Sequence, residues 1–213
     1  MSLVALLLTG AGPAVESRTR VLPAPSCSAQ APETTPAAEL VRRGLRFQGL
    51  ACGTSDTLQA ECFFLRAMYA PGDAAEQAWA FRALVDLRVG QARGLDDLVA
   101  LLAGRRRSSQ HYAWLHAEAW LLFRQGRYGD AAAVLEQLVS GRLHHTAWPW
   151  AMFHDDLGDS YAALGRGDEA RRQWRRALAM SADPKVRANP EGIPWDRAAV
   201  EAKLARSAVR TAR

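Results

Sequence analysis

Histidine and carboxylate side chains gather in one stretch of the sequence, where they could bind a metal ion or transfer protons. His144 and His145 precede the run His154-Asp155-Asp156, and imidazole and carboxylate groups are common metal ligands. Because His144 and His145 are adjacent and fall between expected helices, they point in different directions, and we interpret the group as structural. The chain contains no GxSxG motif, glycine-rich phosphate loop or HExxH motif. The sequence therefore predicts a protein without enzymatic activity, metal or cofactor.

Positive charge concentrates toward the C-terminus. Residues 171–213 contain eleven basic and four acidic side chains, a net charge of +7; the whole chain carries +5, so residues 1–170 carry −2. Such a basic region can meet an anionic partner, and the run Arg105-Arg106-Arg107 could contact phosphate. We interpret both as solvated surface, with the three arginines in a loop between repeats. Anion or nucleic-acid binding by the basic C-terminal third is the alternative function.

The N-terminal residues have features of an export signal. A short apolar run from Leu3 to Leu8 is followed by small residues up to Ala14, but no basic residue precedes it. We expect residues 1–36 to hold this signal-like segment and a flexible linker rich in proline, serine and threonine. Export to the periplasm or the exterior is favoured, with a cytoplasmic location as the alternative. No apolar stretch in the sequence approaches the length of a transmembrane helix.

The chain has an odd number of cysteines, namely Cys27, Cys52 and Cys62. Three are too few for a scaffold held by several disulfides or for a four-cysteine zinc site. In an exported protein one pair can be oxidised, which leaves one free thiol.

An apolar pattern typical of one face of a helix recurs four times along the chain. The four sets are Ala60, Phe63, Phe64 and Ala67; Leu95, Leu98, Val99 and Leu102; Ala131, Val134, Leu135 and Leu138; and Ala170, Trp174 and Ala177. They begin 35, 36 and 39 residues apart, and a second apolar helix is expected before each set. Each preceding helix ends at a glycine that suits a left-handed turn, at Gly53, Gly90, Gly126 or Gly165.

The third and fourth helical pairs resemble the tetratricopeptide repeat (TPR), a helix–turn–helix unit of about 34 residues. In the fourth pair the matching residues are Leu157, Gly158 and Tyr161 of the LGxxY motif, then Gly165, Ala170, Trp174, Ala177, Leu178 and Pro184. The third pair matches at Gly126, Tyr128, Ala131, Leu135 and Leu138. Glu118 and His154 depart from the residues that the family prefers. The resemblance covers residues 41–184.

The resemblance implies an all-α fold, a right-handed α-solenoid of about four helix–turn–helix repeats with a C-terminal capping helix. The repeat domain is expected to span residues 37–188, with units near 41–75, 76–111, 112–150 and 151–184. Residues 189–213 are expected to form a loop and a basic capping helix. In that helix we expect Asp196 to cap the N-terminus, Val200 and Leu204 to face inward, and Lys203 and Arg206 to face water.

In the family, the first helices of the repeats line a concave groove that holds an extended or helical peptide. The matching positions here are Gln77, Leu84, Arg88, His116, Trp120, Phe123, Arg124, Met152, Asp155 and Asp159. Trp120 beside Phe123 and Arg124 has the composition of a binding hot spot, and the alternative is that Trp120 packs under a neighbouring helix. The other tryptophans on apolar stripes, Trp79, Trp114 and Trp174, are expected in the core.

The best-known peptide site of the family holds a C-terminal carboxylate with lysines and asparagines. This chain has Asp155 and Asp159 at such positions, so a carboxylate clamp of that kind is not expected. The predicted function is therefore a non-enzymatic scaffold or adaptor for protein–protein interaction, with a protein or peptide of mixed charge as its partner.

Overall fold

The structure is a computed structural model and describes residues 34–49, 54–90, 95–108, 111–140, 150–182 and 195–211. These residues form nine helices and the turns between them, without a strand, which confirms the expected all-α class. The helices are α1 (Ala37–Gly49), α2 (Thr54–Ala67), α3 (Ala74–Arg88), α4 (Asp96–Ser108), α5 (Tyr112–Arg124), α6 (Tyr128–Val139), α7 (Trp150–Ala163), α8 (Gly167–Ser181) and α10 (Arg197–Thr211). No helix in this described part has the length and apolar character needed to cross a membrane.

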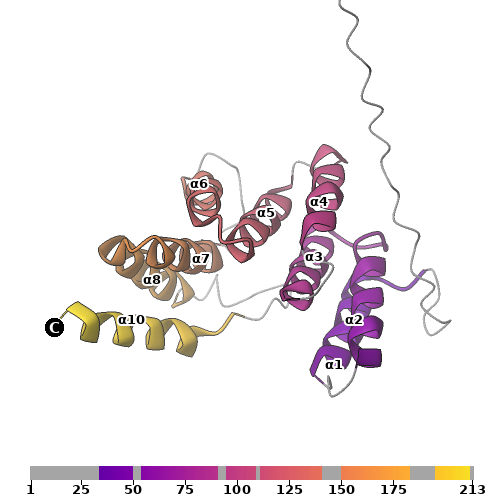
Figure 1. Cartoon of the computed structure of the whole chain (residues 1–213), viewed down its shortest axis with the longest axis horizontal. Helices are drawn as coiled ribbons and strands as arrows, with labels where there is room; N and C mark the ends of the chain where they lie inside the picture. Colours follow the sequence, from indigo (N-terminus) through magenta and orange to yellow (C-terminus); the bar gives the residue numbers. More distant parts are fainter. Residues whose placement is uncertain are drawn as a thin grey trace, which may run out of the picture.

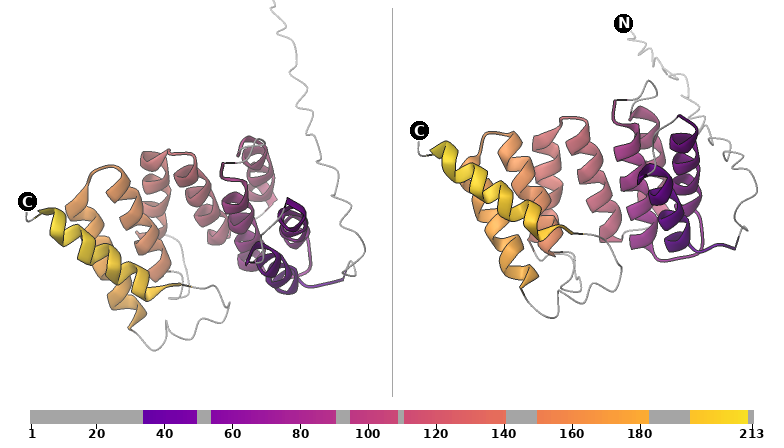
Figure 2. Two further views of the ribbon diagram at one scale, coloured as in Figure 1. Left: turned by 60° about the horizontal axis from the view of Figure 1, so that its bottom comes forward. Right: turned by 90° about the horizontal axis from the view of Figure 1, so that it is seen from below.

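The helices form a row that runs from α1 to α8, and α10 lies across its C-terminal end (Figures 1 and 2). Three pairs form closely packed hairpins: α1 with α2, α5 with α6, and α7 with α8. Helix α3 packs against α1, α2 and α5, and α6 packs against α7. Helix α10 packs on α8. This order brings α3, α5 and α7, which are far apart in the sequence, to neighbouring positions.

Helix α4 departs from the expected pattern, because its closest helix among those described is α5 rather than α3. The expectation that Arg105-Arg106-Arg107 form a loop is also wrong, since all three lie on α4. Neighbouring residues hold the side chains of the first two, Arg105 and Arg106. The Arg105 guanidinium lies 3.9 Å from the centre of the Tyr69 ring and donates to the carbonyl of Met68. Arg106 forms an ion pair with Glu118.

The turns inside the α5–α6 and α7–α8 hairpins have the same geometry. Gly126 and Gly165 have φ angles of 76° and 75°, a left-handed conformation that costs glycine little. The next residue closes the helix end in each case: Arg127 N–H donates to Leu122 O at 2.9 Å, and Arg166 N–H donates to Tyr161 O at 2.8 Å. Gly90 after α3 also has a positive φ, 78°. The prediction of left-handed glycine ends is thus confirmed at three of its four positions.

The apolar stripes build two cores that meet at α5. The first core contains Phe63, Phe64, Phe81, Leu84 and Trp114, and the second contains Leu135, Leu138, Phe153, Leu157 and Trp174. The expected core positions of Trp114 and Trp174 are confirmed, whereas Trp79 is only partly buried. Val99 of the expected α4 stripe is 47 % exposed. Close packing of α7 on α8 needs Gly158, because a Cβ there would lie 2.5 Å from the Trp174 indole.

The capping helix α10 is held by apolar and polar contacts. Val200 is fully buried and Leu204 packs against the second core. Asp196 accepts a hydrogen bond from Ala199 N–H at 3.1 Å, which confirms its expected capping role. Lys203, however, does not face water as expected. Its ammonium group contacts two carboxylates of α7, because these lie one turn apart on the side of α7 that faces α10.

Several expectations fall on residues outside the described part of the chain: the signal-like segment, Gly53, His144, His145, Pro184, the loop before α10, Cys27 and Cys52. Cys62 on α2 is disulfide-bonded. Since the chain has only two other cysteines, the partner of Cys62 also lies outside the described residues.

Candidate functional site

A shallow surface hollow lies between α5 and α7; it is not a cavity, since the volume in it that is accessible to water is about 0 Å³. Its lining residues are Ala119, Trp120 and Phe123 of α5, Leu135 of α6, and Asp156, Asp159 and Ser160 of α7. We call this surface the α5–α7 hollow. One wall is aromatic and the other carries two aspartates, so the surface combines apolar area with negative charge.

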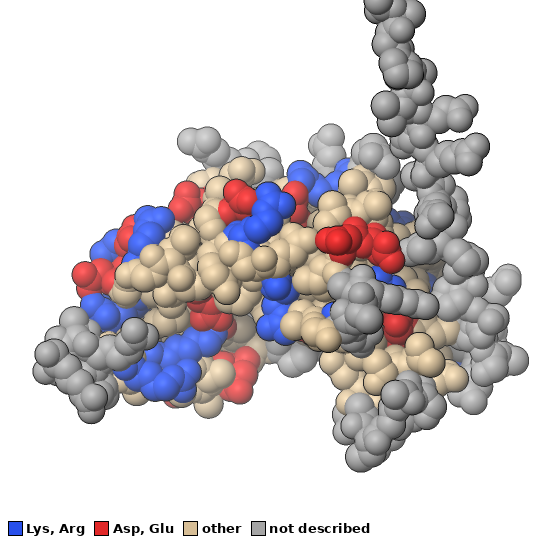
Figure 3. Space-filling view, in the orientation of Figure 1, with Lys and Arg blue, Asp and Glu red and all other residues tan. Residues whose placement is uncertain are grey.

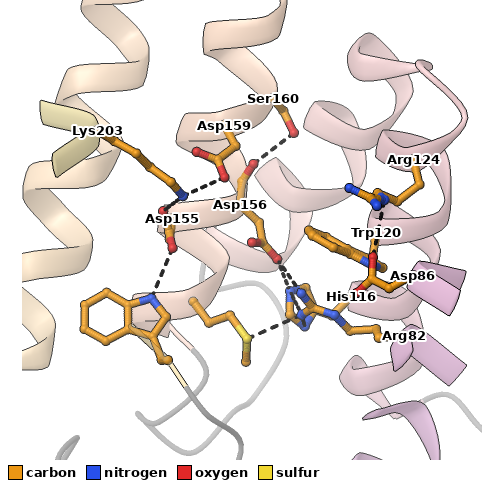
Figure 4. A network of polar contacts seen from close by, with 12 residues as sticks. Arg82, Asp86, His116, Trp120, Arg124, Asp155, Asp156, Asp159, Ser160 and Lys203 are labelled. Atoms are coloured by element: carbon orange, nitrogen blue, oxygen red, sulfur yellow. Dashed lines mark hydrogen bonds and ion pairs between the residues drawn. The ribbon is translucent and has the colours of Figure 1, made fainter. Parts of the chain in front are cut away.

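Trp120 is held between α5 and α3 (Figure 4). Its indole N–H donates to Asp86 Oδ1 at 3.1 Å. The guanidinium groups of Arg82 and Arg124 lie 4.5 Å and 5.6 Å from its ring centre, within the range of cation–π attraction. Phe123 stacks beside it, with ring centres 5.9 Å apart. Trp120 is therefore partly buried, as in the alternative in which it packs against a neighbouring helix, and its remaining surface lines the hollow.

A buried polar network crosses from α3 through α5 to α7. His116 Nε2 lies 2.6 Å from Asp156 Oδ2, and Arg82 Nη1 lies near both ring nitrogens, 2.8 Å from Nε2 and 3.0 Å from Nδ1. A neutral imidazole satisfies both contacts when Nε2–H donates to Asp156 and Nδ1 accepts from Arg82. Burial, together with the charge of Arg82, lowers the pKa of His116 to about 4. Burial opposes ionisation of Asp156, but Arg82 and His116 outweigh it and lower the pKa of that carboxyl.

Lys203 closes the other side of α7. Its Nζ lies 2.8 Å from Asp155 Oδ1 and 2.7 Å from Asp159 Oδ2. Each carboxylate also accepts a hydrogen bond from an indole N–H: Trp195 donates to Asp155 at 3.2 Å, and Trp174 donates to Asp159 at 3.0 Å. Burial and the nearby Asp156 raise the pKa of Asp155 to about 6, although Lys203 opposes the shift. Burial likewise raises the pKa of Asp159.

The ten candidate groove residues divide into two groups of five. Buried are Leu84, Arg88, His116, Met152 and Asp155. Partly exposed are Gln77, Trp120, Phe123, Arg124 and Asp159.

The buried group does not present an open surface, which corrects the expected orientation of these side chains. Leu84 is fully buried because α3 is surrounded by α1, α2 and α5. Arg88 is only 2 % exposed, and its Nη2 and Nε lie 2.5 Å and 3.2 Å from Glu61 Oε1. Met152 accepts a hydrogen bond from Arg82 through its sulfur at 3.3 Å.

Within the partly exposed group, Trp120, Phe123 and Asp159 line the α5–α7 hollow. Arg124 stands next to it, with its Nε 3.3 Å from Asp86 Oδ1. Gln77 makes its side-chain hydrogen bond elsewhere: its amide donates to Ala70 O at 3.0 Å.

Five residues of this region were not among the expected groove residues: Arg82, Asp86, Asp156, Ser160 and Lys203. A signal for two of them was present in the repeat spacing. Arg82 contacts His116 and Asp86 contacts Trp120, and both pairs are 34 residues apart. Equivalent positions of neighbouring repeats lie side by side in a stack, so complementary side chains one repeat apart predict such contacts.

The hollow offers carboxylates and aromatic faces but no cluster of metal ligands. In the described ranges no group of three or more histidine, cysteine or acidic side chains is placed to hold a metal ion. Ser160, the one hydroxyl that lines the hollow, is fully buried and donates to the backbone carbonyl of Asp156 at 2.9 Å. Comparison of the chain with models of known families, with curated protein sequences and with solved structures finds no significant match.

Proposed function

We propose that the chain forms a right-handed, TPR-like solenoid with α10 as its cap. The first helices of the four pairs begin at residues 37, 74, 112 and 150, a nearly constant spacing. The second helix of each of the first three pairs, α2, α4 or α6, packs against the first helix of the next pair. The matching glycine turns after α5 and α7 add a third repeated feature. Regular neighbour-to-neighbour packing of this kind supports a repeat architecture.

We further propose that this solenoid is a non-enzymatic scaffold that holds a segment of a partner protein against the α5–α7 hollow. The observation that carries the proposal is a partly exposed aromatic pair, Trp120 and Phe123, that lines a shallow hollow together with Asp156 and Asp159 of α7. Aromatic side chains surrounded by charged groups are enriched where proteins bind each other. The polar network behind the wall keeps these side chains in fixed positions, so little ordering is needed when a partner binds.

Site-specific crosslinking tests this proposal. A photoreactive amino acid is placed at Phe123 in the hollow and, as a matched control, at Leu58, an exposed apolar residue of α2 that is 62 % exposed. We expect a discrete crosslinked protein at position 123 only. The crosslinked segment, made as a peptide, then binds the full chain, and Phe123→Ser weakens binding while Leu58→Ser does not. Identical products at both positions, or no product at position 123, would show that the hollow is not a binding surface.

Anion binding by the C-terminal region is the second candidate, because basic side chains remain exposed there. Arg172, Arg175 and Arg176 share one face of α8 and are all exposed, and basic side chains gather over α10 (Figure 3). A salt titration separates the two candidates, since phosphate contacts weaken steeply with salt concentration. Binding at the aromatic hollow should change little over the same range.

A further inference from the structure

The disulfide bond of Cys62 brings another part of the chain to α2. Cys62 is disulfide-bonded and only 6 % exposed. Leu58, one turn earlier on the same side of α2, is 62 % exposed, and Leu65, one turn later, is partly buried. The bonded segment therefore meets α2 on a side that carries apolar side chains. Its cysteine is either Cys27 or Cys52, since the chain has no others.

The geometry of α2 disfavours Cys52 as the partner. Cys62 lies eight residues after Thr54, the first residue of α2, which is about 12 Å along the helix axis. Cys52 precedes Thr54 by two residues, which span at most about 7 Å. A disulfide joins Cα atoms that are about 4–7 Å apart. Cys52 would reach Cys62 only if the chain folded straight back along the first two turns of α2, against the backbone of that helix.

The chain that precedes α1 approaches α2 from its other end. Ala37 N–H donates to Pro71 O at 2.8 Å, just beyond the C-terminal end of α2. Thr35 and Ala37 are both buried there, and a Cβ added at Gly72 would lie 2.9 Å from the Cβ of Ala37. The residues before α1 are thus anchored beside the end of α2.

From this anchor Cys27 has ample length to reach Cys62. Cys27 precedes Ala37 by ten residues, which span up to about 33 Å when extended. Cys62 is only five residues from the end of α2 at Ala67, about 8 Å along the axis. Pro32 and Pro36 lie in the connecting segment, and proline favours extended chain in the residue before it.

The position of α2 gives such a segment a structural role. The α1–α2 hairpin lies at the opposite end of the row from α10 (Figure 2). The end units of a repeat stack need cover for the apolar side that has no further neighbour. At the C-terminal end α10 supplies it, with Val200 fully buried.

We propose that Cys27 is the disulfide partner of Cys62, and that residues 27–36 form a strap across the Leu58–Leu65 side of α2. The strap is fixed at both ends, by the disulfide at Cys62 and by the Ala37–Pro71 hydrogen bond. It holds the first helical pair together at the N-terminal end of the row, as α10 does at the other end. This inference is independent of the proposed scaffold function.

Peptide mapping of the unaltered full chain tests the pairing. Free thiols are alkylated without reduction, and the chain is digested with trypsin and with an enzyme that cleaves before aspartate. Cleavage before Asp56 separates Cys52 from Cys62, and cleavage after Arg42 and Arg46 separates Cys27 from both. Mass spectrometry should find the Cys27 and Cys62 peptides linked and Cys52 alkylated.

Two serine variants test the strap, Cys27→Ser and its matched control Cys52→Ser. Cys27→Ser should lower the midpoint of thermal unfolding by about 5–15 °C, because it removes a covalent link that closes a long loop. Cys52→Ser should change it little. Dithiothreitol should lower the midpoint of the unaltered chain and of Cys52→Ser by a similar amount, and leave Cys27→Ser unchanged. In hydrogen exchange, Cys27→Ser should speed exchange in α1 and α2 more than in α8.

Each contrary outcome identifies the part of the inference that fails. A linked Cys52–Cys62 peptide, or equal losses of stability for the two serine variants, would overturn the pairing. If Cys27 is linked to Cys62 but exchange in α1 and α2 is the same in Cys27→Ser, the segment is tethered without covering α2, and the strap is wrong. Because the peptide map uses the unaltered chain, it decides the pairing even if a variant does not fold.

Discussion

Two buried acid–base groups of the network beside the hollow, His116 and Asp155, should make opposite contributions to the pH dependence of stability. Burial lowers the pKa of His116 from 6.5 to about 4. In that interval the unfolded chain binds a proton that the folded chain does not, so this group makes the protein more stable as pH rises. Burial raises the pKa of Asp155 from 3.8 to about 6. Between these two pKa values the folded chain binds a proton that the unfolded chain does not, so this group makes the protein less stable as pH rises.

The two contributions have similar size. Each pKa shift is somewhat more than two units, and one unit corresponds to about 1.4 kcal/mol, so each group contributes about 3 kcal/mol over its full range. Between about pH 4 and pH 6 the opposite slopes nearly cancel in the unaltered protein. A single substitution removes one slope and exposes the other.

Urea unfolding followed by tryptophan fluorescence between pH 4 and pH 7 measures these slopes. On acidification from pH 7 to pH 4, His116→Gln should gain up to about 3 kcal/mol of unfolding free energy relative to the unaltered protein. Asp155→Asn should lose a similar amount over the same range. The double variant is the control, since its difference from the unaltered protein should stay nearly constant with pH. Differences that have the same sign for both single variants, or no dependence on pH, would refute the assignment of these two groups.

Further predictions concern stability and packing, each measured by thermal or urea unfolding. Trp174→Ala should destabilise the fold by about 3–5 kcal/mol, because the residue is buried in the second core. Trp120→Ala should cost less stability, because Trp120 is only partly buried. Equal losses for the two variants would place both tryptophans in the core. Arg88→Ala should cost about 3–5 kcal/mol, since it removes one member of the buried ion pair with Glu61, and an unchanged midpoint would contradict this. Gly158→Ala should cost about 1–3 kcal/mol through its collision with Trp174. Gly129→Ala on α6, where an added Cβ meets open space, should be neutral or slightly stabilising, and equal losses for the two glycines would refute the packing argument.

The helical periodicity of the sequence was sufficient to predict the buried face of α2, although it placed Val99 of α4 on a buried face and that side chain is exposed. Ala60, Phe63, Phe64 and Ala67 were placed on one face by their spacing alone, and all four are buried. The glycine turns were predictable for a similar reason, because a left-handed helix end strongly favours glycine. Both are local properties, decided within one or two helical turns of the chain.

Charged side chains were predicted less well, because their environment depends on helices distant in the sequence. Arg88 was expected at a groove, yet it pairs with Glu61, 27 residues earlier. Lys203 was expected in water, yet its partners lie on α7, more than 40 residues earlier. A charged residue that pairs with a distant residue has the same local pattern as one that faces solvent. Only the packing of α2 on α3, and of α10 beside α7, distinguishes the two.

Helix α5 belongs to both cores at once, and this has a consequence for how the molecule unfolds. Trp114, Ala117 and Leu121 face the first core, whereas Ala119 faces the second. Unfolding of the helices that build either core would remove the neighbours on one side of α5. Neither core can therefore unfold without weakening the other. Nearest-neighbour coupling of this kind makes a row of repeats behave as a single cooperative unit. Because α5 carries residues of both cores, any ligand that bound only the folded α5 would stabilise both cores against unfolding together.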